Sequence, residues 1–204
     1  MGRRDEDRIL TLPNAISVAR LLLVPVFLWL LFGPSNREGA AVLLAALGLT
    51  DWVDGYVARH LGQVSTVGKV LDPTADRVLL GAAVVAVLVD GSVPVWLGIA
   101  ALAREALVSA AAVALAALGA RRIEVQWVGK AGTFGLMVAL PLFLISHSEA
   151  SWRHVAQALA WTAAVPGLAL AWYAAWSYVP VARAALVEGR AAKPERTGAL
   201  GGRQ

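Results

Sequence analysis

Long stretches with few or no charged residues set the strongest limit on how this 204-residue chain can fold. The chain is 58% hydrophobic and 16% charged, with a mean hydropathy of +0.65, whereas a soluble domain is nearer half apolar and a quarter charged. A helix that crosses a bilayer needs about 20 mainly apolar residues. The sequence therefore predicts an all-α bundle of membrane-spanning helices. The least charged runs are Ala15–Phe32, Ala40–Thr50, Val78–Val89 and Val93–Ala120.

The apolar runs divide into six predicted transmembrane helices. We expect one membrane domain over residues 14–187, a cytoplasmic N-terminal segment over residues 1–13 and a disordered cytoplasmic tail over residues 188–204. The first run is too long for a signal peptide, so we expect it to be retained. The last run exceeds one straight span, and it either tilts, kinks near Pro166 or emerges as a cytoplasmic helix. The six spans are Asn14–Phe32, Gly39–Arg59, Lys69–Val89, Val93–Leu118, Val128–Ser146 and His154–Val187.

Lysine and arginine are concentrated on one side of these six spans. The other side carries Arg37 and Arg153. Because loops rich in these residues stay in the cytoplasm, we predict a multi-pass protein of the cell membrane with both termini cytoplasmic, together with the loop between spans two and three. The basic residues on the predicted cytoplasmic side are Arg3, Arg4, Arg8, Arg59, Lys69, Arg77, Arg121, Arg122, Lys130, Arg183, Arg190, Lys193, Arg196 and Arg203.

Four aspartates flank that cytoplasmic loop, where acidic side chains near a bilayer are costly and usually functional. Asp51 and Asp54 are three positions apart and share a helix face, which Gly55 and Ala58 continue with very small side chains. Asp72 and Asp76 are four positions apart, and Gly68 lies four positions before Asp72 on the same face. Two antiparallel helix ends would bring the four carboxylates together and leave room for a ligand.

Four carboxylates in one place repel one another, so some are protonated or cations lie between them. The chain has no cysteine, and oxygen ligands alone suit Mg²⁺ or Mn²⁺. Four carboxylates are enough for two ions, and substrate phosphates commonly complete such sites. Arg59 lies about one turn beyond Asp54 and could bind phosphate. The alternative is that these aspartates cap helices or pair with arginines, and the agreement of helical spacing, small residues and arginine argues against it.

The segment from Asp51 to Asp76 resembles the signature of the CDP-alcohol phosphatidyltransferases. The signature reads D, two residues, D-G, two residues, A-R, eight residues, G, three residues, D, three residues, D, and the segment matches every fixed letter. The Pro13-Asn14 start and Arg20 also resemble the first helix of that family. The resemblance covers most of residues 12–182 and implies transfer of a phosphatidyl group from CDP-diacylglycerol to an alcohol, with release of CMP. The matching residues are Asp51, Asp54, Gly55, Ala58, Arg59, Gly68, Asp72 and Asp76.

The resemblance also implies a role for each of these residues. Asp51, Asp54 and Asp72 would be metal ligands, and Asp76 would be both a ligand and the general base that deprotonates the acceptor hydroxyl. Binding of the CDP-lipid would fall to Asp51, to Arg59 at a phosphate, and to the small residues Gly55, Ala58 and Gly68, which let the nucleotide approach. We expect a homodimer, as is common in such families.

The acceptor is less well defined by the sequence, and we favour a glycerol-type acceptor, with glycerol 3-phosphate ahead of phosphatidylglycerol. Residues 12–31 and 103–105 resemble phosphatidylglycerophosphate synthases, which use glycerol 3-phosphate. Residues 128–144 resemble the actinobacterial-type cardiolipin synthases, which use phosphatidylglycerol; inositol phosphate is a weaker alternative. Arg104, Arg121 and Lys130 are candidates for binding the acceptor. For Arg104 the alternative is helix packing, and for the other two it is membrane topology.

Other classes of protein remain possible. A divalent-cation transporter could use the aspartates as an ion path, but it predicts acids deeper in the spans and gives no role to Gly55, Ala58 or Arg59. An intramembrane prenyltransferase should have its two aspartate motifs far apart in sequence. Nucleic-acid binding is not expected, because no basic stripe with interleaved aromatic residues is present. Arg20 lies about one and a half turns into the first span, so its side chain could snorkel to the membrane interface.

Overall fold

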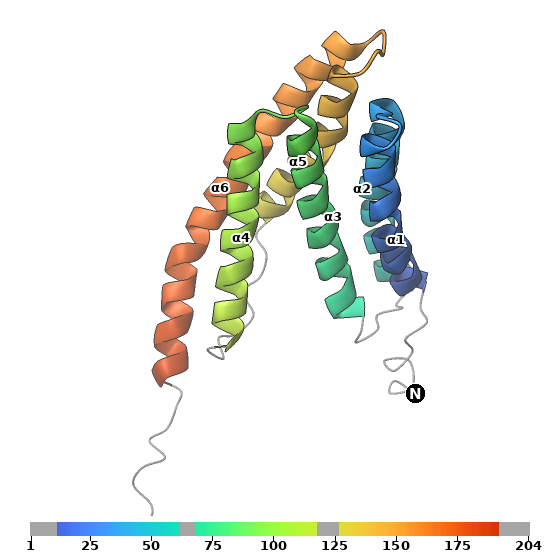
Figure 1. Ribbon diagram of the computed structural model, residues 1–204. Helices are drawn as coiled ribbons and strands as arrows, with labels where there is room; N and C mark the ends of the chain where they lie inside the picture. The colour runs from blue at the N-terminus through green and yellow to red at the C-terminus, as the bar shows by residue number, and fades with distance from the viewer. Residues whose placement is uncertain (1–11, 62–67, 118–126, 192–204) are drawn as a thin grey trace, which may run out of the picture.

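Six helices that alternate in direction make up the described part of the protein (Figure 1). The computed structural model describes residues 12–61, 68–117 and 127–191, and it describes side chains for residues 15–50, 77–114 and 127–177. These residues contain no strand, so the predicted all-α fold is confirmed. The predicted and observed boundaries differ most at the end of the last helix, predicted at Val187 and observed at Ala191. The helices are α1 (Leu12–Phe32), α2 (Arg37–Leu61), α3 (Gly68–Asp90), α4 (Val95–Ala117), α5 (Trp127–Ser146) and α6 (Arg153–Ala191).

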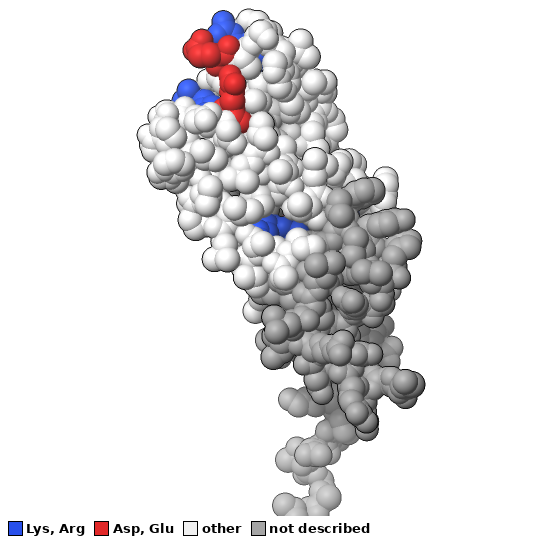
Figure 2. Space-filling view, turned by 90° about the vertical axis from the view of Figure 1, so that its right-hand side faces the viewer, with Lys and Arg blue, Asp and Glu red and all other residues white. Residues whose placement is uncertain are grey.

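The outer surface of the bundle is apolar enough to face lipid. Leu22 is 68% exposed, Trp29 is 64% exposed and Val113 is 69% exposed, and Figure 2 shows a broad white surface below a charged upper end. Over the described residues, α1, α4, α5 and the first part of α6 are long and apolar enough to cross a membrane. The protein is therefore a multi-pass membrane protein. That all six helices cross the bilayer stays a prediction, because α2 and α3 do not meet this criterion over the residues that were described.

Short turns connect the helices at the end of the bundle away from the aspartates, and residues that favour helix ends lie in these turns. Asn36 caps α2, because its Oδ1 accepts a hydrogen bond of 2.8 Å from the backbone N–H of Gly39. Gly91 ends α3 with a φ of 78°, a conformation that favours glycine. These turns fix the antiparallel order of α1 with α2 and of α3 with α4. The long α6 is about 58 Å at 1.5 Å per residue, longer than a bilayer core is thick.

A polar clamp joins α2, α3 and the end of α5 at this same end. Arg37 Nε donates to both oxygens of Asp90, at 3.3 and 3.0 Å, and Arg37 Nη1 donates to the carbonyl of His147 at 3.2 Å. The Asp90 side chain is 9% exposed and also accepts from the hydroxyl of Ser92. The clamp therefore neutralises a nearly buried carboxylate and ties the first residue of α2 to the last residue of α3.

Removing one partner of this clamp should destabilise the bundle. We expect Arg37→Ala to lower the free energy of unfolding by roughly 1–3 kcal/mol, because the carboxylate of Asp90 stays nearly buried without its charged donor. The double variant Arg37→Ala/Asp90→Ala should lose less free energy of unfolding than the two single variants, Arg37→Ala and Asp90→Ala, lose in total. Thermal unfolding of the detergent-solubilised protein measures both effects. Additive losses would show that the two side chains do not interact.

The closest helix crossing lies between α5 and α6, the pair of helices with the most extensive contact. A Cβ atom added to Gly132 would lie 2.6 Å from the backbone nitrogen of Ala171 and 2.8 Å from the carbonyl oxygen of Gly167. A Cβ atom on Gly135 would lie 3.0 Å from the Cα atom of Gly167. Small residues permit this backbone contact, which replaces the hydrophobic effect as the main attraction between helices in lipid.

Candidate active site

The aspartate motif occupies two adjoining helix ends. Asp51 and Asp54 lie in α2, about 15 and 10 Å before its end, and Asp72 and Asp76 lie in α3, about 6 and 12 Å after its start, at 1.5 Å per residue. Six residues separate α2 from α3, so both motif halves lie at one end of the bundle (Figure 1). Gly55, Ala58 and Arg59 lie in the same part of α2, and Gly68 is the first residue of α3. The side chains of residues 51–76 lie outside those that the structure describes.

The donor set of this motif fits hard divalent cations. It offers up to four carboxylates, and the chain has no thiol that would favour a softer metal. Among the side chains that are described, no group of three or more potential metal ligands occurs. That the motif binds a metal stays a prediction, which the chemistry of its donor atoms supports.

The helix α1 contributes a buried arginine that sequence reasoning placed wrongly. Arg20 is 1% exposed and is the largest of the fully buried side chains described. The prediction that Arg20 reaches the membrane interface is therefore wrong, because its face of α1 packs into the bundle. Ser17, Val24, Phe27 and Leu31 are also buried, at steps of three or four residues from Arg20. Exposed apolar residues such as Val18, Leu22 and Val26 follow the same spacing on another face of α1, so the sequence alone did not show which face is buried.

Arg104 lies buried where α4 meets α5 and α6, with 6% of its surface exposed. Its Nε donates to the carbonyl of Ala171 in α6 at 3.3 Å, and its Nη1 donates to the hydroxyl of Thr133 in α5 at 3.4 Å. It also pairs with the neighbouring Glu105. These bonds agree with the packing interpretation of Arg104, and its binding of the acceptor stays a prediction.

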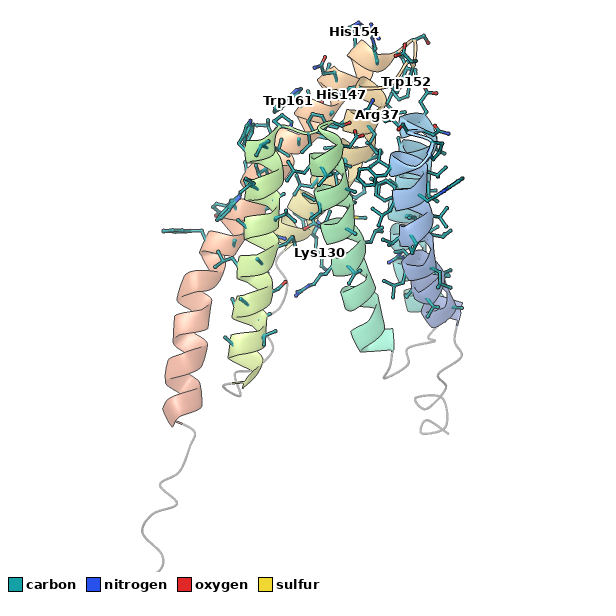
Figure 3. All side chains as sticks on the ribbon, in the orientation of Figure 1. Arg37, Lys130, His147, Trp152, His154 and Trp161 are labelled. Carbon is teal, nitrogen blue, oxygen red and sulfur yellow. The ribbon has the colours of Figure 1, made fainter. Side chains whose placement is uncertain are left out.

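The remaining candidates lie at different places. Lys130 is exposed near the start of α5 and lies at about mid-height of the bundle in Figure 3, whereas His147 and His154 lie near the upper end. This separation agrees with the expectation that these histidines take no part in the reaction. Arg121, the third acceptor candidate, lies outside the described residues.

An apolar groove of about 310 Å³ runs between α2 and α5. Gly48 and Leu49 form part of its wall, three and two residues before Asp51, and Trp152 forms part of it near the start of α6. Almost all of the groove surface is carbon, so it suits a hydrocarbon chain better than a polar ligand. The groove therefore extends from the opposite end of the bundle toward the aspartate motif.

Comparison with known proteins decides the family. Residues 10–173 match the sequence profile of the CDP-alcohol phosphatidyltransferases. The chain belongs to the CDP-alcohol phosphatidyltransferase family. The predicted enzyme class is thereby confirmed: the protein is a transferase of phospholipid biosynthesis.

Individual members of this family align with most of the chain. A protein of Streptomyces coelicolor named cardiolipin synthase (CMP-forming) is 40% identical over 182 residues, which cover 87% of this chain and 85% of that protein. A Mycobacterium tuberculosis protein named putative cardiolipin synthase is 35% identical over 195 residues, 93% of each chain. A Bacillus subtilis protein named CDP-diacylglycerol–glycerol-3-phosphate 3-phosphatidyltransferase is 32% identical over 148 residues, 66% of this chain and 76% of that protein. The names of these relatives thus include both a cardiolipin synthase and a phosphatidyltransferase that acts on glycerol 3-phosphate.

Proposed function

We propose that this phosphatidyltransferase transfers the phosphatidyl group of CDP-diacylglycerol to phosphatidylglycerol, which yields cardiolipin and CMP. One observation carries the choice of acceptor: the relatives named cardiolipin synthase align over 87% and 93% of the chain, at 40% and 35% identity. Relatives that are named for glycerol 3-phosphate align over 66% and 87% of the chain at 32% and 33% identity, so it is the higher identity of the cardiolipin synthases that favours phosphatidylglycerol. This choice departs from the preference drawn from the sequence alone, in which glycerol 3-phosphate was ahead of phosphatidylglycerol.

The aspartates of the motif would bind the donor through divalent ions. Asp51, Asp54, Asp72 and Asp76 would hold two Mg²⁺ or Mn²⁺ ions, which when bound supply positive charge to the diphosphate. Arg59 would bind a phosphate oxygen of the donor directly. The nucleotide would approach the side of the site that is formed by Asp51 and by the small residues Gly55, Ala58 and Gly68.

The reaction itself requires one proton transfer and one displacement at phosphorus. A hydroxyl oxygen of the acceptor glycerol attacks the β-phosphorus of CDP-diacylglycerol, the one that carries the lipid. The new phosphorus–oxygen bond forms as the bond to the bridging oxygen breaks, and that oxygen leaves with CMP. Asp76 takes the hydroxyl proton and later releases it to water. The products are the phosphodiester, CMP and one proton.

The apolar groove and three basic residues would bind parts of the substrates that lie beyond the reacting groups. The groove between α2 and α5 lies within one turn of Asp51 and would take an acyl chain of a substrate lipid. Lys130, and Arg121 with it, would attract the anionic headgroup of the acceptor. Arg104 would act in the same region, since its guanidinium lies 3.6 Å from the position of a Cβ on Gly129, next to Lys130.

Glycerol 3-phosphate is the second candidate acceptor. The Ala103–Glu105 segment favours it by its resemblance to phosphatidylglycerophosphate synthases, and the Bacillus subtilis relative carries that activity in its name. The same aspartates would act in the same way, because the attacking group is again a glycerol hydroxyl. The acceptor's anionic phosphate would then need Lys130 more strongly, since it carries more charge than a phosphodiester.

The distribution of basic residues supports a cytoplasmic location for the active site. With lysine and arginine in excess at the end that carries the aspartates, this end would face the cytoplasm, where CDP-lipids and soluble acceptors meet the membrane. Both chain termini would lie on that side, and the membrane domain would extend over residues 14–187. A homodimer is expected by resemblance to related families.

A parallel assay of three acceptors tests this proposal. The purified protein, in detergent with Mn²⁺, is given CDP-diacylglycerol and either phosphatidylglycerol, glycerol 3-phosphate or inositol phosphate, and lipid products are identified by mass spectrometry. We expect cardiolipin to form about tenfold faster than phosphatidylglycerophosphate and EDTA to stop both reactions. If phosphatidylglycerophosphate forms faster than cardiolipin, glycerol 3-phosphate would be the preferred acceptor. Ion movement in vesicles without CMP release would instead favour a cation transporter.

A further inference from the structure

The buried face of α1 changes from apolar to polar along its length. Leu31, Phe27 and Val24 form the apolar part of this face, in the half of α1 that is remote from the aspartate motif. One turn further toward the start of α1, the same face carries Arg20 and then Ser17, which are 1% and 0% exposed. Both of these side chains have an interaction partner. The interior of the bundle is therefore polar beside this half of α1.

This polar half of α1 lies at the level of the aspartates. α1 packs against both α2 and α3, the two helices that carry the motif. α1 and α3 run in the same direction and start at the same end of the bundle (Figure 1). Arg20 is the ninth residue of α1 and Asp76 is the ninth residue of α3, so each lies about 12 Å from its helix start.

A buried arginine within a membrane bundle pairs with acidic side chains or with backbone carbonyls, and an acidic partner also offsets its charge. Three of the acidic side chains that the structure describes, Glu38, Asp90 and Glu149, belong to the opposite end of the bundle, and Arg20 is about 18 Å from that end of α1. The fourth described acid, Glu105, pairs with Arg104. On the helices that contact α1, the acids at the level of Arg20 are therefore those of the motif.

We propose that Arg20 is a positioning residue of the aspartate site, whose guanidinium pairs with motif carboxylates and fixes their orientation for metal and substrate. This inference rests on the proposed function for the identity of the site. The planar guanidinium can donate two parallel hydrogen bonds to a carboxylate, which a lysine ammonium cannot. Burial in the bundle excludes water that would otherwise compete for these bonds.

Three variants of α1 separate this role from simple packing. Arg20→Gln removes the charge, Arg20→Lys keeps the charge without the planar fork, and Val24→Ala loosens the same buried face one turn away without changing any charge. Mn²⁺ binding to the purified full-length protein is measured by electron paramagnetic resonance, and CMP release is measured as kcat and KM for each substrate. Thermal unfolding in EDTA reports the stability of each variant.

We expect Arg20→Gln to weaken Mn²⁺ binding and to reduce kcat, each by about 10–100-fold, as is typical when a partner of a metal ligand is removed. The KM for the acceptor should stay within about twofold, because Arg20 acts through the aspartates. Arg20→Lys should give intermediate values. Val24→Ala should unfold at a lower temperature than the unchanged protein and keep its Mn²⁺ affinity.

Wild-type Mn²⁺ affinity and kcat in Arg20→Gln would overturn the proposal, and so would an equal loss of Mn²⁺ affinity in Val24→Ala. If Arg20→Gln does not fold, Arg20→Lys decides: wild-type values overturn the proposal, and weaker Mn²⁺ binding with a wild-type unfolding temperature supports it. Failure of the proposed function would look different. The unchanged protein would then bind Mn²⁺ but release no CMP with any acceptor, and the Mn²⁺ measurement would still test Arg20.

Discussion

Replacing Asp76 by asparagine should reduce CMP release by about 10²–10⁴-fold while CDP-diacylglycerol still binds. The amide of asparagine has the size of the carboxylate but cannot accept the hydroxyl proton, so the displacement loses its general base. The other three aspartates of the motif are unchanged in this variant and keep most of the ligands for the metal and the donor. Single-turnover release of CMP measures the loss, and equilibrium binding of radiolabelled CDP-diacylglycerol measures the retained affinity.

Asp90→Asn is the matched control for this experiment. It is the same chemical change on the same helix, at the opposite end of α3 and within the clamp with Arg37. We expect Asp90→Asn to unfold at a lower temperature and to keep its rate of CMP release well below that temperature. Near-normal turnover in Asp76→Asn would exclude Asp76 as the base. If Asp76→Asn loses both CDP-diacylglycerol binding and turnover, Asp76 would be assigned to donor binding instead.

The sequence predicted those parts of the protein that depend on local pattern. The apolar runs gave six helices because the membrane forces backbone groups to bond within each helix. The fixed spacing from Asp51 to Asp76 indicated the family, because all eight fixed residues of the signature lie within one short segment. Gly33-Pro34 follows the end of α1, and Gly91 follows the end of α3, where glycine and proline end a helix through their own backbone.

The features that the sequence did not predict depend on contacts between distant helices. Arg20 was assigned to the membrane interface because a single helix gives no information on which face is covered by its neighbours. The bonds of Arg104 to Thr133 and to the carbonyl of Ala171 join three helices and leave no local signal. The acceptor was not determined either, because phosphatidylglycerol and glycerol 3-phosphate present the same attacking hydroxyl and differ only beyond it.

The close contact between α5 and α6 predicts that a larger residue at the crossing will strongly destabilise the protein. Gly132→Ala should lower the free energy of unfolding by roughly 1–3 kcal/mol, because the new methyl group would overlap backbone atoms of Ala171 and Gly167, which cannot rotate away. The helices must then separate along their most extensive contact. Thermal unfolding of the detergent-solubilised protein measures the change.

Gly81→Ala is the control, since a Cβ atom at this position in α3 would have no atom within 4 Å. It should be neutral or stabilising by up to about 1 kcal/mol, because alanine favours a helix more than glycine does. Separation of α5 from α6 would also draw the carbonyl of Ala171 away from Arg104. Gly132→Ala should therefore slow CMP release below its unfolding temperature, whereas Gly81→Ala should not. A Gly132→Ala protein as stable as the Gly81→Ala protein would show that the two helices do not cross at this glycine.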